Sequence, residues 1–455
     1  MVYREAHEPG CASEPKANES DMIKVTKTEN IIKIVFVGSM FTFLAMNMNL
    51  GFASELAWWA RWWFLGLLLY FGAVSILTQK HFRKMMGLDF SLLVMAFSYL
   101  ASALFSPNSA KTLLYLLMYV IELLAIIRCT RNLTMGTWRL VISVLFVAIT
   151  VGAAMTLVGA VSAGEVENRL SGKTNANSVG VSCMIGLLLG YPQLWLKSRF
   201  KWAMRGAMLI PLLLLYLSGS RSSLSGLIVG TVFPFWAMRR IKVMLLVFAM
   251  LAVMSVAYFG IYASSERKEM LLDDFNVRVV RGETAEERLS SRQTNWDECL
   301  MYWRLRPALG WGFSTTDPSG ERPIDGSGYH GLLASVGVIG CVGFGFHLLV
   351  LLLTEFKHRK RRFSVLPDTD PQNGRWLFST GAGLSAGMLV QGVGEPWMIG
   401  IGSVMTFAYL LSLGALLSSL SWADFLERQE GSVRRPSPSW RQRSQEGLPG
   451  ARFGL

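Results

Sequence analysis

Long runs of hydrophobic residues, separated by short polar stretches, fill the chain between residues 31 and 420. Most runs have the length that an α-helix needs to cross roughly 30 Å of hydrocarbon. The pattern therefore predicts about twelve membrane-spanning helices. They are centred on 31–50, 57–77, 89–106, 111–127, 139–162, 178–196, 206–218, 223–238, 243–263, 331–354, 376–392 and 400–420.

One long hydrophilic segment, residues 264–329, interrupts this series. Within it, 287–313 has helical spacing, and five side chains recur on one face at intervals of three or four residues. They are Arg288, Arg292, Trp296, Leu300 and Trp303. This spacing predicts an amphipathic helix at the membrane interface, anchored by aromatic residues. The two glycines in the stretch from Pro307 to Phe313 favour a bend that returns the chain to the membrane.

Composition agrees with a membrane protein. Hydrophobic residues make up 52% of the 455 residues, and there are 15 Trp and 26 Phe. A soluble domain of this length does not need so much apolar surface. The expected fold class is an all-α polytopic membrane protein with one large loop outside the cytoplasm.

The distribution of Lys and Arg predicts the orientation, because positive charge in short loops resists translocation. Alternate short loops are rich in both residues, as in the run from Lys357 to Arg362, and these loops are assigned to the cytoplasm. Both termini are then cytoplasmic. The predicted segments are a cytoplasmic N-terminal segment 1–30, helices in 31–263, the large loop 264–329, helices in 330–420, and a disordered cytoplasmic tail 421–455.

The net charge of +13 is mostly accounted for by these cytoplasmic loops, so no nucleic-acid partner is expected. The five cysteines include no CxxC pair, and the sequence has no Walker, HExxH or GxSxG motif. ATP-driven transport and zinc or serine hydrolysis therefore lose most of their support.

Two short loops on the predicted outer side carry isolated cations. Arg169 precedes a helix expected to begin near Ser178, with Asn175 and Asn177 as candidate caps, and a helix N-terminus favours a phosphate. Arg221 lies in a tight Ser- and Gly-rich turn beside the hydrocarbon, where its forked donors suit a phosphate group. Snorkelling to lipid phosphates and close helix packing are the structural alternatives for the two loops.

The large loop supplies the other candidates. Arg288 and Arg292 lie one helical turn apart and could face a phosphate or pair with nearby Glu286, Glu287 and Asp297. His330 opens the next span at the outer boundary, which places an imidazole where it could act as a general base. A structural role for this histidine remains the alternative.

The order of these motifs resembles the O-antigen ligase and polymerase superfamily of bacterial envelope glycan assembly, which includes exopolysaccharide polymerases. The resemblance covers roughly 160–350. It rests on "RLSGKTNAN" before a span, "SGSRSSLSG" at a later turn, "SRQTNW" and "RPALGWGF" in the large loop, and His330 at the start of the next span.

The resemblance implies a GT-C-like glycosyltransferase in the bacterial inner membrane that acts on a glycan linked to polyprenyl diphosphate. Arg169, Arg221, Arg292 and, less closely, Arg288 match arginines that would hold the diphosphate, and His330 matches the histidine proposed to accept the acceptor's proton. No metal and no cofactor is implied. Envelope glycan-assembly proteins, a chain-length regulator among them, are the implied partners.

The acceptor stays open. Ligases of this family tend to follow the histidine with Asn and an aromatic residue, whereas Gly331 and Leu332 follow it here, and this favours a polymerase over a ligase that transfers glycan to lipid A core. A flippase of lipid-linked glycans would need charged residues within its spans, where Glu122 is nearly the only acidic one. A lipid-binding scaffold is a third alternative. Glu395 is a further candidate proton acceptor or a packing residue.

Overall fold

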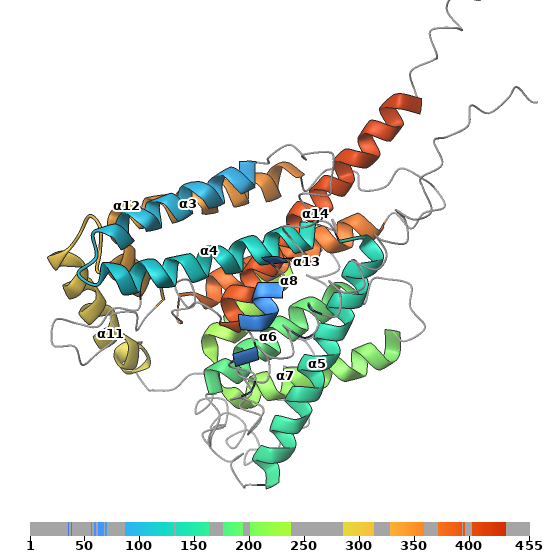
Figure 1. Ribbon diagram of the computed structural model, residues 1–455. Coiled ribbons are helices and arrows are strands. Elements are labelled where there is room, and N and C mark those ends of the chain that lie inside the picture. Colours follow the sequence, from blue (N-terminus) through green and yellow to red (C-terminus); the bar gives the residue numbers. More distant parts are fainter. Residues whose placement is uncertain are drawn as a thin grey trace, which may run out of the picture.

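The computed structural model describes residues 87–131, 133–162, 176–193, 201–237, 285–313, 328–358, 372–393, 395 and 403–433, with isolated positions between 35 and 70. All regular structure in these ranges is helical (Figure 1). The helices are α3 (Gly87–Leu104), α4 (Ser109–Arg131), α5 (Met135–Ser162), α6 (Ala176–Gln193), α7 (Lys201–Ser218), α8 (Arg221–Ala237), α11 (Ala285–Leu305), α12 (Gly328–His358), α13 (Gln372–Gln391) and α14 (Val404–Val433).

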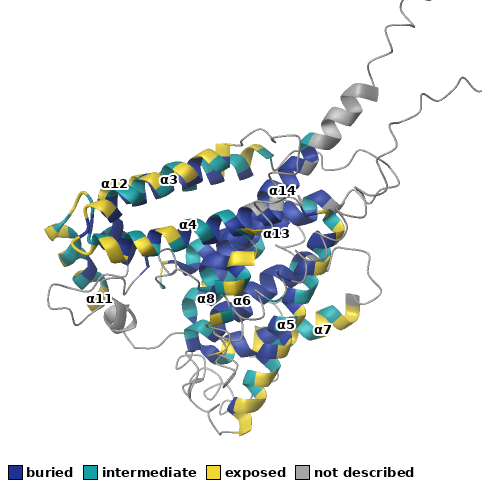
Figure 2. Ribbon diagram, in the orientation of Figure 1, coloured by how far each residue is buried: buried dark blue, intermediate teal, exposed yellow. Residues whose placement is uncertain are grey.

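Three of these helices form the interior of the bundle. Helices α6, α13 and α14 are buried along most of their length, and 94% of the apolar part of α14 is covered by protein (Figure 2). By contrast, large apolar side chains of α3, α5 and α12 point outward, among them Phe97, Val158 and Leu353. Exposed leucine, valine and phenylalanine on long apolar helices are what a hydrocarbon environment selects.

Five helices in the described ranges are long and apolar enough to cross a membrane: α3, α4 up to Ile127, α5, α12, and α14 up to Ser421. Helices α6 and α7 contain shorter apolar stretches. The chain is thus a multi-pass membrane protein by length and composition, although the described helices give five candidate spans where hydropathy predicts about twelve. The predicted spans 31–50, 57–77 and 243–263 lie outside the continuously described residues.

Helices α8 and α13 pack closely through paired glycines. A Cβ atom on Gly230 would lie 2.6 Å from the carbonyl oxygen of Gly383, and one on Gly226 would lie 2.7 Å from that of Gly387. Within each helix the two glycines are four residues apart, which is the small-xxx-small pattern that lets membrane helices approach. Because the residue number rises along one helix as it falls along the other, the two helices are antiparallel.

Three element boundaries differ from the hydropathy pattern. Helix α14 continues to Val433, so the first part of the segment predicted as a disordered tail is helical. The helix predicted in the large loop is present as α11, but it ends at Leu305 and the residues up to Phe313 form turns. Helix α12 begins at Gly328, slightly before the predicted span, and it is not continuous.

The break in α12 lies at Gly337, which has φ 63° and ψ −170°. The chain therefore changes direction between two half-helices, 328–336 and 338–358. The rings of Tyr329 and Phe344 lie 6.4 Å apart between centroids, whereas a continuous helix would separate their Cα atoms by about 22 Å. The first half-helix, which carries His330, is thus folded back toward the second.

Candidate functional site

Arg221 is the first residue of α8, and the turn before it is held by serines. Gly219 has φ 57°, a conformation that glycine adopts without strain. Ser220 precedes the helix, its carbonyl accepts the amide of Leu224 at 3.0 Å, and its hydroxyl lies 2.9 Å from that of Ser223. Ser220 is therefore the N-cap of α8. Arg221 is half-buried at a helix N-terminus, where an anion is favoured.

The antiparallel packing of α8 and α13 places Arg221 beside the end of α13. Gly226 lies against Gly387 and close to Gln391, whose Cβ is 3.5 Å from where a Cβ on Gly226 would be. Arg221 lies five residues before Gly226, on the side toward which α13 ends. The first turn of α8 and the last turn of α13 are therefore neighbours.

The start of α12 packs on the same end of α13. A Cβ on Gly328 would overlap the carbonyl oxygen of Gly392 and lie 2.6 Å from that of Val393. The hydroxyl of Tyr329 donates to the carbonyl of Leu389 at 2.8 Å. Arg221 and His330, more than a hundred residues apart in sequence, thus both lie at the C-terminal end of α13. We call this end of the bundle, where α6, α8 and α12 begin and α13 finishes, the polar end.

Helix α11 contributes to the polar end through Trp296. The indole ring of Trp296 stacks on the imidazole of His330, with centroids 5.0 Å apart and planes inclined by 23°. The Nδ1 atom of His330 is buried and has no hydrogen-bond partner among the described residues. An imidazole nitrogen held without a partner is available to a group that enters the site.

The structure describes less of the other three predicted arginines. Arg292 and Arg288 lie one and two helical turns before Trp296 in α11, as the spacing predicts, but only their backbone is described. Arg169 lies outside the described residues. The structure therefore places Arg221, His330 and the helix that carries Arg288 and Arg292 at the same end of the bundle. The positions of the Arg288 and Arg292 side chains stay a prediction.

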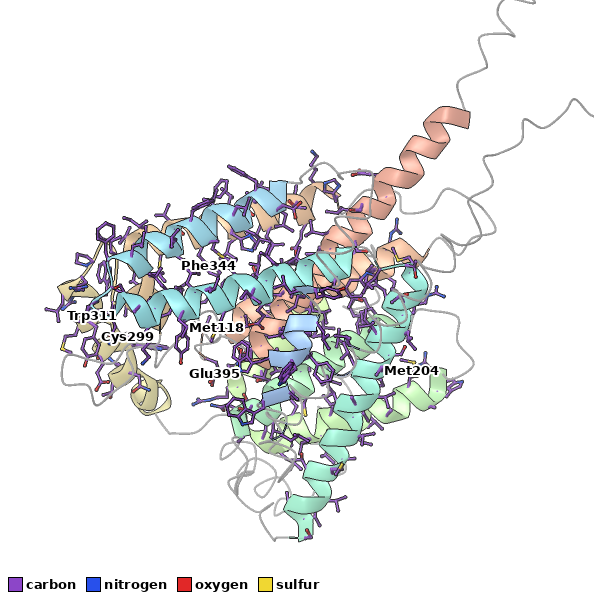
Figure 3. All side chains as sticks on the ribbon, viewed as in Figure 1. Met118, Met204, Cys299, Trp311, Phe344 and Glu395 are labelled. Carbon is purple, nitrogen blue, oxygen red and sulfur yellow. The ribbon has the colours of Figure 1, made fainter. Side chains whose placement is uncertain are left out.

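Glu395 joins the polar end through a side-chain pair that sequence does not reveal. Its carboxylate accepts a hydrogen bond from the amide of Asn177 at 2.8 Å. The side chain of Glu395 is labelled in Figure 3. The prediction of Asn177 as a helix cap is wrong, because α6 begins at Ala176 and Asn177 lies in its first turn. Its side chain instead links the start of α6 to the segment that follows α13.

The loop after α11 fills the break in α12. The amides of Val338 and Ile339 donate to the carbonyls of Pro307 and Ala308 at 2.9 and 3.1 Å. In return, the carbonyls of Ala334 and Ser335 accept the amides of Trp311 and Gly312 at 3.0 and 2.7 Å. These bonds satisfy backbone groups that the broken helix leaves open, as an apolar environment requires.

Several side chains fix this loop in place. Ser102 of α3 donates to the carbonyls of Leu309 and Ser335, the second at 3.1 Å. Ser106 donates to the carbonyl of Trp311 at 2.5 Å, and the indole of Trp311 donates to the carbonyl of Tyr302 in α11 at 2.8 Å. The predicted bend is thus confirmed, and it ties α11 to the half-helix that carries His330.

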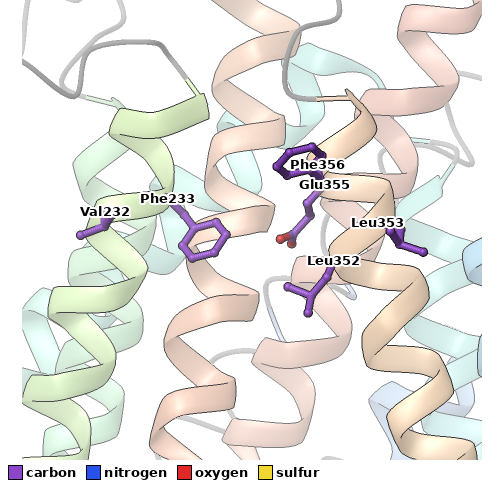
Figure 4. A pocket seen from close by; sticks show the side chains of 6 residues that line it. All are labelled: Val232, Phe233, Leu352, Leu353, Glu355 and Phe356. Carbon is purple, nitrogen blue, oxygen red and sulfur yellow. The ribbon is translucent and has the colours of Figure 1, made fainter.

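A separate cavity of about 430 Å³ lies between α8 and α12, lined by Val232, Phe233, Leu352, Leu353, Glu355 and Phe356. Figure 4 shows the carboxylate of Glu355 directed into this space, opposite Phe233. Glu355 is 3% exposed and accepts a hydrogen bond from Ser385 at 2.9 Å. Val232 lies roughly 16 Å along α8 from Arg221, so the cavity is distinct from the polar end.

One buried histidine inside the bundle is bonded to two other side chains. His347 contacts the hydroxyl of Ser91 at 2.9 Å through Nδ1 and that of Tyr409 at 3.0 Å through Nε2. Glu122 is fully buried, as expected for an acidic residue within a span. Glu355 is a second buried acidic residue, one position beyond the predicted span 331–354. The hydrogen bonds of His347 and Glu355 join helices, and such a role is structural.

Part of the chain matches a known protein family. Residues 206–345 match the model of a family described as O-antigen ligase, a segment that runs from α7 into α12 and contains Arg221, Arg288, Arg292 and His330. No curated protein matches the chain. Residues 206–345 therefore carry a domain of the O-antigen ligase family, and the resemblance of the chain to the O-antigen ligase and polymerase superfamily is confirmed.

Proposed function

We propose that this protein is a membrane glycosyltransferase that transfers or polymerises oligosaccharide units linked to polyprenyl diphosphate. The observation that supports the proposal is that α8 and α12, which carry Arg221 and His330, both begin at the C-terminal end of α13, within the segment that matches the O-antigen ligase family. A cation and an imidazole whose Nδ1 has no hydrogen-bond partner among the described residues are two groups suited to the displacement of a diphosphate by a hydroxyl.

In the proposed reaction, an acceptor hydroxyl attacks the anomeric carbon of the lipid-linked sugar. The new glycosidic C–O bond forms while the bond from that carbon to the diphosphate oxygen breaks, with inversion. His330 takes the proton of the acceptor hydroxyl, and the leaving group departs as polyprenyl diphosphate. Its negative charge develops where Arg221 and the N-terminus of α8 supply positive charge, and such preorganised charge is a major source of catalysis.

Arginines would therefore do here what a divalent cation does in many glycosyltransferases, with Arg169, Arg288 and Arg292 as further diphosphate ligands. The proposal places the polar end outside the cytoplasm and both termini inside, in the inner membrane, with a GT-C-like arrangement of helices. It favours a polymerase of exopolysaccharide or O-antigen type, because Gly331 and Leu332 follow His330.

The test is an assay with purified, detergent-solubilised protein and lipid-linked oligosaccharide in EDTA, with products resolved on a gel. Wild type is expected to give a ladder of longer lipid-linked glycans, and Arg221→Ala to lose it. Arg205→Ala is the matched control, since Arg205 is exposed on α7 and lies over the ring of Trp202, away from α13. The control variant is expected to retain the ladder.

The acceptor is tested in the same assay. Transfer that occurs only after lipid A core is added would identify a ligase. Absence of any product with either acceptor, from protein that is folded and inserted, would contradict a glycosyltransferase and favour transport or a scaffold role.

A further inference from the structure

Helices α6, α8 and α13 meet in layers that can be followed toward the polar end. In one layer, a Cβ on Gly226 would lie 2.6 Å from the sulfur of Met184 and 2.7 Å from the carbonyl of Gly387. One helical turn further toward the polar end, the same faces of α8 and α13 carry Ser222 and Gln391. Gly180 of α6 lies beside this layer, against Ser218 and Ser220. This second layer is the last one before Arg221 and the start of α12.

The polar side chains of this layer are buried and unbonded. Gln391 is 0% exposed, and neither its amide oxygen nor its amide nitrogen has a hydrogen-bond partner among the described residues. The hydroxyl of Ser222 is also buried, and it too has no hydrogen-bond partner among the described residues. Other buried hydroxyls nearby are bonded, such as those of Ser218 and Ser220.

An unbonded carboxamide is unfavourable inside an apolar bundle. A glutamine side chain has two N–H donors and an acceptor oxygen, and burying such groups without partners costs free energy. Native proteins keep few of these groups, and each one calls for a ligand, a water or a functional reason. Gln391 and Ser222 belong to the same interface, between α8 and α13. Ser222 is the residue after Arg221, and Gln391 lies within one helical turn of Leu389, which contacts Tyr329.

Their position relative to the diphosphate site indicates what they would bind. Ser222 follows Arg221 directly, and Gln391 lies two residues after Leu389, whose carbonyl holds Tyr329 beside His330. The sugar attached to the diphosphate of the donor must lie between the group that holds the phosphates and the group that accepts the proton. A carboxamide can accept from one sugar hydroxyl and donate to the next, so adjacent hydroxyls of a pyranose match its two unbonded atoms.

We propose that Gln391, together with Ser222, binds the sugar that is joined directly to the diphosphate of the donor. This inference rests on the proposed function, since it assigns the sugar subsite of the same reaction. It assigns the neutral part of the donor to Gln391 and Ser222, and the charged part to Arg221. Gln391 is a substrate-binding residue in this scheme and takes no part in proton transfer.

The test measures binding to the full-length protein in detergent. The probes are undecaprenyl diphosphate and undecaprenyl diphosphates that carry a single glucose, galactose or N-acetylglucosamine. Wild type is expected to bind at least one glycosylated probe about tenfold more tightly than the bare diphosphate, the difference that one or two hydrogen bonds supply. Gln391→Met keeps the length of the side chain but removes its hydrogen-bonding groups, so it should lose this preference and still bind the bare diphosphate.

Three further variants separate the explanations. Arg221→Ala is expected to weaken binding of all probes. Ser222→Ala should reduce the sugar preference, whereas Ser182→Ala should not, although Ser182 is likewise buried in α6 without a described partner. Binding of the bare diphosphate reports folding of the Gln391, Ser222 and Ser182 variants, and thermal unfolding reports that of Arg221→Ala. Ser222→Ala tests the subsite if Gln391→Met does not fold.

The outcomes are distinguishable. If wild type binds none of the probes, the proposed function itself fails. If wild type binds the bare diphosphate but no glycosylated probe more tightly, or if Gln391→Met and Ser222→Ala keep the full preference, the sugar subsite is overturned while the diphosphate site stands. If Gln391 and Ser222 only bind a buried water, both variants should keep the full preference.

Discussion

The indole of Trp296 stacks on the imidazole of His330, with ring centroids 5.0 Å apart. The two residues belong to different elements, α11 and the first half-helix of α12. Between the elements, the buried side chains of Cys299 and Ala334 pack together with Tyr302, Trp303 and Trp311 around them. The orientation of His330 is therefore set by its contact with α11, which belongs to the large loop 264–329.

Removal of this stacking should slow the reaction. Trp296→Ala is expected to lower kcat about tenfold, because an aromatic pair of this kind contributes about 0.5–1.5 kcal/mol beyond its buried area. Trp296→Phe keeps a ring in place and should retain most of the activity. Steady-state kinetics with lipid-linked donor would check both variants. A fall in donor affinity with unchanged kcat would contradict an orienting role for Trp296.

Replacement of His330 should affect turnover more than donor binding. His330→Gln is expected to lower kcat by about 10²–10⁴-fold, the usual contribution of a general base, with little change in the KM for the donor. His347→Gln is the matched control, since His347 bonds Ser91 and Tyr409 within the bundle. The control should lower thermal stability and keep the turnover of folded protein. Equal losses of turnover in both variants would exclude a special role for His330.

The break in α12 should be intolerant of a side chain. Gly337 has φ 63° and ψ −170°, a region that is essentially restricted to glycine, and a Cβ there would overlap the carbonyl oxygen of Ala308. Gly337→Ala is expected to destabilise the protein by about 1–3 kcal/mol and to reduce activity through the displaced half-helix. Thermal unfolding in detergent would measure the change.

Gly345→Ala supplies the control for this experiment. Gly345 lies in the second half of the same helix, and a Cβ there would meet nothing within 4 Å. The substitution should leave stability unchanged or raise it slightly, because alanine favours a helix more than glycine does. Similar behaviour of Gly337→Ala and Gly345→Ala would mean that the break is not required.

Hydropathy could predict most helix positions but not the break. The apolar run through α12 is continuous in sequence, and Gly337 is one of several glycines in it, so averaging over a window hides the change of direction. The bonds from Val338 and Ile339 to Pro307 and Ala308 depend on a loop about thirty residues away. Periodicity carries no information on such a non-local match.

The candidate site was predicted in part. Arg221 and His330 stand out in sequence because charged or titratable residues are costly beside hydrocarbon. Gln391 did not, since a single glutamine near the end of an apolar helix has many structural explanations. Asn177 and Glu395 are 218 residues apart, and only the packing of α6 against the end of α13 makes them partners.

Close contact of α8 with α13 should be needed to hold Arg221 in place. A Cβ on Gly230 would lie 2.6 Å from the carbonyl oxygen of Gly383 and 2.8 Å from a methyl carbon of Leu188. A side chain at this position would therefore push α8 and α13 apart. Gly230→Ala is expected to cost about 1–3 kcal/mol, as overpacking of a close interface does. It should also weaken binding of undecaprenyl diphosphate, because α8 carries Arg221 away from the end of α13.

Gly206→Ala is the matched control for this interface. A Cβ on Gly206, in α7, would meet nothing within 4 Å, so the substitution should preserve both the unfolding temperature and diphosphate binding. Thermal unfolding and equilibrium binding on the same preparations would separate the two effects of Gly230→Ala. Loss of stability without loss of binding would show that Arg221 keeps its place without close packing of α8 on α13, and that the glycine pairs serve folding alone.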